Sequence, residues 1–189
     1  FFHAEDGIRD GVMSRGIGDV YQRQNIPSVY LNDFLSNDID KKKAFVNKLG
    51  KAYNEIGFVA LKGHFLDDND IKEVYSSIKE FFDLPEDIKV KYELDGFDGQ
   101  RGYTSFGKEH AKGKKHGDLK EFWHFGQYLD DDEYTKFNYP KNQIVTELPK
   151  FNDIGKKVFQ SLEKTAIYVL RAISLYLDLE EDHFDKYVK

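Results

Sequence analysis

Apolar side chains recur three and four residues apart in three segments of the chain, which is the spacing of an amphipathic helix. These segments are residues 45–56, 71–82 and 154–173. Gly57 can adopt the left-handed conformation that ends the first helix, and Pro85 stops the second. The pattern therefore predicts three helices, with the last extending over about residues 151–176.

The polar positions refine these helices and add two short ones. Asp70 is the predicted N-cap of the second helix, because Glu73 follows it at the spacing of a capping box. Residues 86–92 and 180–188 are each predicted to form a short helix.

Three short segments have the pattern of strands. Val29 and Leu31 alternate along the chain and predict a short edge strand after Pro27. Residues 58–61 form an apolar run between two glycines and are predicted to be a buried strand. Residues 122–125 form a compact aromatic run in which Phe122 and His124 alternate with Trp123 and Phe125, and they predict a further strand, with His124 expected to be a buried, hydrogen-bonded histidine.

The remaining segments carry little periodicity. Residues 95–117 are rich in glycine and lysine and predict a long loop of the kind that carries function, and residues 130–149 predict a polar linker. Residues 1–24 have no apolar face, so we expect a non-native or disordered leader that adds nothing to stability, followed by one domain over residues 25–189. Together the elements predict an α+β fold whose few strands need partners from elsewhere.

Composition narrows the class of protein. The chain has 189 residues, 40% of them hydrophobic, which is enough for one domain with its own core. A net charge of −6 provides no basic surface for nucleic acid. No apolar run approaches the ~20 residues of a membrane span, and the lack of cysteine suits a reducing compartment, so we expect a cytoplasmic protein.

Two histidine-containing patterns could be mistaken for a metal site. His116 and Asp118 form His-x-Asp, with His183 further along, while His183 and Asp185 repeat the spacing near the end of the chain. An iron centre with two histidines and one carboxylate needs its ligands on rigid neighbouring elements. Because His116 falls in the predicted loop and His183 in a terminal helix, we expect no metal ligand and no catalytic residue in this chain.

Four segments, taken in order, carry a family resemblance: residues 55–64, 81–92, 99–107 and 118–126. They resemble the N-terminal region of the non-haem iron, 2-oxoglutarate-dependent oxygenases related to isopenicillin N synthase. The resemblance implies a jelly-roll (double-stranded β-helix) core that follows this region and carries the iron-binding His-x-Asp, a distal His, and an Arg-x-Ser for 2-oxoglutarate. We expect this chain to stop before most of that barrel and to be inactive alone, with Fe(II) and 2-oxoglutarate bound only by the parent enzyme.

Arg101 and Tyr103 are the predicted substrate-binding residues. The planar guanidinium of an arginine matches a carboxylate, and Gly102 allows close approach of a ligand. The resemblance implies that the arginine reaches the mouth of the active site and contacts a small-molecule substrate, with Tyr103 beside it. The alternative is that Arg101 pairs with a surface glutamate.

One further expectation follows if the barrel is missing. Apolar helix faces that would meet the barrel are expected to be exposed, so that the chain self-associates. The rival interpretation is a stand-alone, non-catalytic helical module that binds another molecule.

Overall fold

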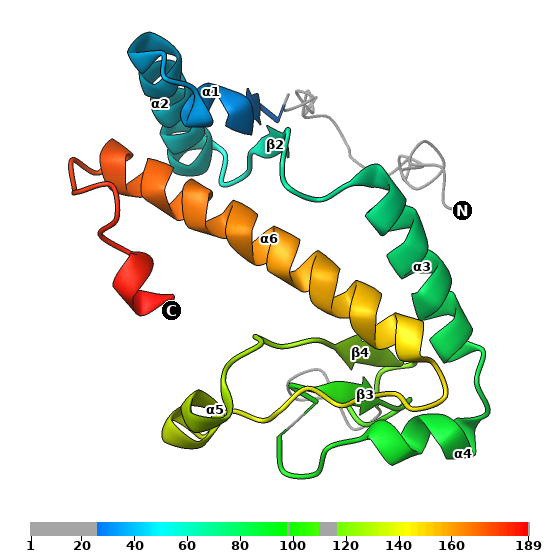
Figure 1. Cartoon of the computed structure of the whole chain (residues 1–189). Coiled ribbons are helices and arrows are strands. Elements are labelled where there is room, and N and C mark those ends of the chain that lie inside the picture. The colour runs from blue at the N-terminus through cyan, green and yellow to red at the C-terminus, as the bar shows by residue number, and fades with distance from the viewer. Residues whose placement is uncertain (1–25, 98, 110–116, 189) are drawn as a thin grey trace, which may run out of the picture.

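The computed structural model describes residues 26–97, 99–109 and 117–188. Its central element is the helix α6 (Pro149–Tyr176), which crosses the whole molecule and has other elements packed at both ends (Figure 1). The predicted leader, residues 1–24, and His116 lie outside the described residues.

Residues 28–62 pack against the C-terminal end of α6. They form β1 (Ser28–Tyr30), α1 (Leu31–Leu35), α2 (Ile39–Glu55) and β2 (Ala60–Lys62). β1 and β2 are parallel, with Val29 opposite Leu61. One core lies here, and its buried members are Val29, Leu31, Phe34, Phe45, Val46, Leu49 and Ala172.

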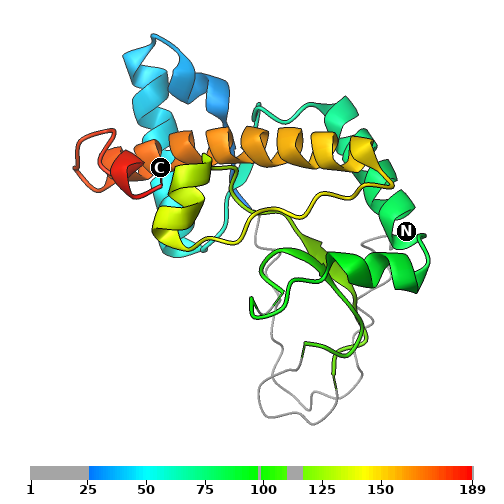
Figure 2. The same cartoon turned by 60° about the horizontal axis from the view of Figure 1, so that its bottom comes forward.

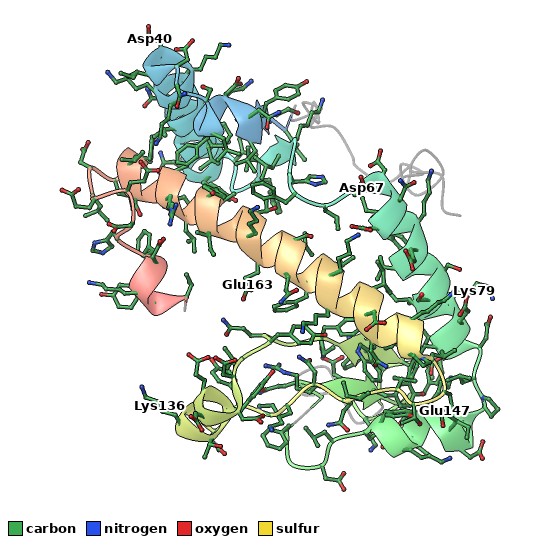
Figure 3. The ribbon with its side chains drawn as sticks, in the orientation of Figure 1. Asp40, Asp67, Lys79, Lys136, Glu147 and Glu163 are labelled. Atoms are coloured by element: carbon green, nitrogen blue, oxygen red, sulfur yellow. The ribbon has the colours of Figure 1, made fainter. Side chains whose placement is uncertain are left out.

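The helix α3 (Asp68–Phe82) packs along the N-terminal half of α6, and α4 (Glu86–Lys89) and the 3-10 helix η1 (Val90–Tyr92) follow it (Figure 1). Asp67 lies at the start of α3 and Lys79 near its other end (Figure 3). The buried carboxylate of Asp70 accepts a hydrogen bond from Lys157 Nζ of α6 at 2.7 Å. This ion pair ties the two helices together.

The antiparallel hairpin of β3 (Gly102–Thr104) and β4 (Phe122–His124) lies beside the N-terminal end of α6 (Figures 1 and 2). The helix α5 (Asp131–Phe137) follows the hairpin, and the 3-10 helix η2 (Asp185–Tyr187) ends the described chain. A second, largely aromatic core joins the hairpin to α3, η1 and α6; its buried members are Phe81, Tyr92, Tyr103, Val145 and Phe151. Among the residues that the structure describes, no helix is both long and apolar enough to cross a lipid bilayer.

The three long helices are confirmed, but the start of α3 is not. The side chain of Asp67, not of Asp70, accepts the first-turn hydrogen bond, from Asn69 N at 2.7 Å. Asp70 falls inside the first turn because Asp67 caps the helix three residues earlier, and the Asp70 carboxylate instead accepts a hydrogen bond from Lys157. The left-handed conformation predicted for Gly57 is present, with φ of 83°.

The predicted strands and loops need larger corrections. The strand expected at 58–61 is β2 at 60–62, and Phe58 is 68% exposed, because pairing with β1 begins only at Ala60. The predicted loop over 95–117 contains β3, and the predicted linker over 130–149 contains α5. The segment predicted as a helix over 180–188 forms turns and the single 3-10 turn of η2. The described chain is thus a mixed fold of helices with a few short strands.

Candidate functional site

The hairpin that carries Arg101 and Tyr103 is seated on η1 by a glycine. Gly102 has φ of 71°, and a β-carbon there would lie 2.3 Å from the carbonyl oxygen of Tyr92. Only glycine accepts both this conformation and this close approach. The first residue of β3 is therefore fixed against the preceding element, and Arg101 stands at the point where the hairpin begins.

Tyr103 belongs to the second, largely aromatic core, on which the hairpin packs. Its side chain is buried, and its hydroxyl donates a hydrogen bond to Glu121 Oε2 at 2.5 Å. Lys89 of α4 donates to the same carboxylate oxygen at 2.7 Å and to the Phe82 carbonyl at 3.2 Å. Burial, and then the hydrogen bond to the Glu121 carboxylate, raise the pKa of Tyr103 well above its ordinary value. The tyrosine therefore remains a protonated donor.

Aromatic rings fill the space beneath this polar network. Phe81 is fully buried and lies 4.7 Å from the ring of Trp123 and 5.1 Å from that of Phe151, the second in a stacked arrangement. Tyr103 packs edge-on to Phe81 at 5.9 Å. Because α3, β3, β4 and α6 each contribute a ring, the hairpin has a rigid support of the kind that a binding site needs.

Arg101 is half-buried, and its guanidinium is held by backbone groups. Nη1 donates to the Gln100 carbonyl at 2.6 Å, and Nε is buried with no acceptor. The group lies against Gly126, where a β-carbon would come within 1.8 Å of Nε. No carboxylate of the described residues pairs with Arg101, so the alternative interpretation as a surface ion pair finds no support in this part of the chain.

A hollow of about 380 Å³ lies between the hairpin and residues 93–96. Glu93 and Thr104 line it, and the Thr104 hydroxyl is buried with no hydrogen-bond partner. Burial alone would raise the pKa of Glu93, but hydrogen bonds from Lys108 and Ser105 outweigh it and lower this pKa. His124 is exposed on the hairpin, with Nδ1 2.6 Å from the Gly99 carbonyl oxygen. The prediction of a buried histidine was therefore wrong, because its partner lies at the rim of the hairpin.

The described residues do not fit an iron centre. Within residues 26–97, 99–109 and 117–188, no three His, Cys, Asp or Glu side chains gather as metal ligands. Asp185 is bound by Arg171 at 2.6 Å, and His183 packs against Phe184 at 5.0 Å between ring centroids. His116, the other histidine considered, is outside the described residues.

The sequence pattern suggested Arg101 and Tyr103 as candidates but did not reveal the residues that hold them. Glu121 and Lys89 complete the buried network, while Gly126 lies against the guanidinium and Asn142 hydrogen-bonds Gly126. Gly126 ends the aromatic run 122–125, and a glycine directly after a strand is a signal of close approach. Lys89, Glu121 and Asn142 gave no such signal, because their partners are distant in sequence.

Comparison with known proteins places this geometry in a family. Residues 26–147 match the family model described as the non-haem dioxygenase in morphine synthesis N-terminal region. A 1-aminocyclopropane-1-carboxylate oxidase of Dictyostelium mucoroides is 28% identical over 170 residues, which are 86% of this chain and 45% of the oxidase. The 2-oxoglutarate-Fe(II) type oxidoreductase ppzC of Metarhizium rileyi is 27% identical over 176 residues, 85% of this chain and 46% of that protein.

Solved structures agree with these relatives. A 2OG-Fe(II) oxygenase family protein from Caulobacter crescentus superposes with a TM-score of 0.72 and 35% identity, covering 85% of this chain and 51% of that one. A full-length Neurospora crassa protein, solved in complex with alpha-KG, shares the fold at a TM-score of 0.68 and 22% identity, covering 85% of this chain and 46% of that protein. The chain spans about half the length of the relatives it matches. It belongs to the family of non-haem dioxygenase N-terminal regions, within the 2-oxoglutarate- and Fe(II)-dependent oxygenases.

Proposed function

We propose that residues 25–189 are the N-terminal region of an oxygenase that depends on Fe(II) and 2-oxoglutarate and oxidises a small molecule. The observation that carries this proposal is the family match over residues 26–147, together with relatives whose names state this chemistry. In such an enzyme, O₂ and 2-oxoglutarate supply the oxidising power for hydroxylation, desaturation or ring closure. Because no three metal-binding side chains gather in the described residues, the part proposed for them is to contact the substrate and to support the rest of the enzyme.

Arg101 is the proposed contact to the substrate, and a carboxylate is the group it would bind. A guanidinium offers donors in a planar fork that matches a carboxylate. Support comes from the lack of a protein carboxylate beside Arg101 in the described residues and from its position at the start of a rigid hairpin. Tyr103 contributes by fixing β3, because its hydroxyl is already used by Glu121.

We also propose that a jelly-roll domain of the same protein covers the apolar surface between α3 and α6. This surface contains a hollow of about 440 Å³ lined almost wholly by apolar side chains. Solved relatives that share the fold are about twice as long as the matched region, which leaves room for such a domain.

The test uses the protein encoded by the complete open reading frame, supplied with Fe(II), 2-oxoglutarate and O₂. Conversion of 2-oxoglutarate to succinate is measured with a panel of small carboxylic acids and the matching neutral amides. We expect some acids to stimulate conversion and their amides not to, and Arg101→Gln to abolish this preference. Lys79→Gln, which removes an exposed cation on α3, is the matched control and should keep the preference.

Two results would count against the proposal. Equal stimulation by acids and amides would show that no substrate carboxylate is recognised. An unchanged preference in Arg101→Gln would show that Arg101 does not recognise it. If 2-oxoglutarate is not converted under any condition, the proposed oxygenase activity is contradicted.

A further inference from the structure

Gly126 forms the surface on which the Arg101 guanidinium rests. The residue is buried, and a β-carbon at this position would lie 1.8 Å from Arg101 Nε and 1.9 Å from Cζ. Contacts this short cannot exist, so any side chain at position 126 would have to displace the guanidinium. The displaced atoms are the end of a flexible side chain, and the fold itself need not move.

Asn142 holds Gly126 from the segment between α5 and α6. Its Oδ1 accepts a hydrogen bond from the Gly126 N–H at 2.7 Å, and its Nδ2 donates to the Gly126 carbonyl oxygen at 2.9 Å. One side chain thus satisfies both backbone polar groups of the glycine. This double hydrogen bond fixes the plane of the peptide groups against which the arginine packs.

The guanidinium has little else to orient it. Nη1 donates to Gln100 O at 2.6 Å, whereas Nε is buried without an acceptor, and no described carboxylate pairs with the group. An arginine that is not held by an ion pair depends on packing for its orientation. Gly126 supplies that packing, and Asn142 keeps Gly126 in place.

We infer that Gly126 and Asn142 are positioning residues that hold the Arg101 guanidinium ready for an anionic group. This inference rests on the proposed role of Arg101 as a carboxylate contact. A guanidinium held in this way is preorganised for binding, because a donor group that is already oriented loses less side-chain freedom when the ligand binds.

Nuclear magnetic resonance of the arginine Nε–H groups tests the inference directly. The sequence contains five arginines, so the Arg101 signal in the ¹⁵N-labelled chain can be assigned by its loss in Arg101→Lys. We expect Gly126→Ala to shift this signal and to speed exchange of the Nε–H with water by about tenfold or more, because burial protects it in the wild type. Asn142→Leu should act in the same direction, and Asn142→Asp, which keeps an acceptor for Gly126 N–H, should act less.

Lys141→Ala, a change at an exposed neighbouring position, is the control and should leave the signal unchanged. An unaltered Arg101 signal in folded Gly126→Ala and Asn142→Leu would overturn the inference. Unfolding of both variants would also overturn it, since the guanidinium and not the fold should absorb the change. Titration of succinate into the wild type tests the proposed function separately. If the Arg101 signal does not respond, the proposed carboxylate contact is contradicted, while the positioning role of Gly126 and Asn142 still stands.

Discussion

A buried tyrosine, a glutamate and a lysine determine the chemistry at the base of the hairpin. Tyr103 and Lys89 both donate to one oxygen of Glu121, and the side chains of Lys89 and Glu121 are only 9% and 17% exposed. Buried charges are tolerated when they are paired and hydrogen-bonded, as here. The network therefore locks β3 to α4 and to the start of β4.

The raised pKa of Tyr103 predicts how stability changes at high pH. Its ordinary pKa is about 10, and burial with the Glu121 hydrogen bond raises it in the folded state. A raised folded-state pKa contributes stability that is complete below about pH 10 and is lost as pH rises through the folded value. Urea unfolding between about pH 9 and about pH 11 should show the free energy of unfolding fall more steeply in the wild type than in Tyr103→Phe.

Tyr128 provides the control for this measurement. Burial, with a smaller effect of Tyr134, raises the pKa of Tyr128 to about 12, so it adds a fall of the same sign. Tyr128→Phe should remove only the part of the pH dependence of unfolding that Tyr128 contributes. Equal pH dependence in the wild type and Tyr103→Phe would show that the Tyr103 hydroxyl is not buried against Glu121.

Helices were predictable from the sequence where an apolar stripe sets them, and other elements were not. α2, α3 and α6 follow their periodic apolar positions, because helix burial imposes that period. β3 is defined by its pairing with β4, and the three residues Gly102–Thr104 are too few to show an alternating pattern, although Tyr103 and Thr104 favour strands. α5 did have a local signal, since Glu133 accepts from Asp130 N at 3.3 Å, but an acidic run without an apolar stripe is equally typical of a linker.

The same distinction holds for the site. The motif identified Arg101 and Tyr103 as candidates, yet Tyr103 meets Glu121, and Arg101 meets Gly126, only in the folded chain. Asn142 contributes one step further away, by holding Gly126. Long-range side-chain contacts of this kind leave no periodic trace in a single sequence.

The crossing of α2 and α6 gives a prediction in which packing opposes helix propensity. Gly50 lies in α2, and a β-carbon there would be 2.1 Å from Cγ of Tyr176. Alanine is favoured over glycine inside a helix by about 1 kcal/mol, but overpacking costs about 1–3 kcal/mol. We expect Gly50→Ala to lower the free energy of unfolding, as measured by urea denaturation.

A double-mutant cycle isolates the cause. Tyr176→Ala removes the obstructing ring, so Gly50→Ala should be neutral or stabilising in that background. A stabilising effect of Gly50→Ala in the wild-type background would contradict the close approach of the two helices.

At the scale of the whole molecule, α6 joins two separate cores and leaves an apolar surface beside α3. Tyr75 is 70% exposed and Leu162 is 51% exposed on this surface. Exposed apolar patches of this kind promote association. We expect the isolated chain to bind a hydrophobic dye and to self-associate in sedimentation experiments.

The double variant Tyr75→Lys/Leu162→Lys should reduce both dye binding and association, and Lys79→Gln on the same helix should change neither. A monodisperse wild-type monomer that binds no dye would contradict the expectation that this surface is made to be covered.

The most direct test of the central claim is the nucleotide sequence of the open reading frame that contains these 189 codons. If the chain is the N-terminal region of an oxygenase, the frame continues past Lys189 and encodes His-x-Asp, a distal His and Arg-x-Ser in that order. A stop codon directly after the codon for Lys189 would contradict this account and favour the stand-alone binding module.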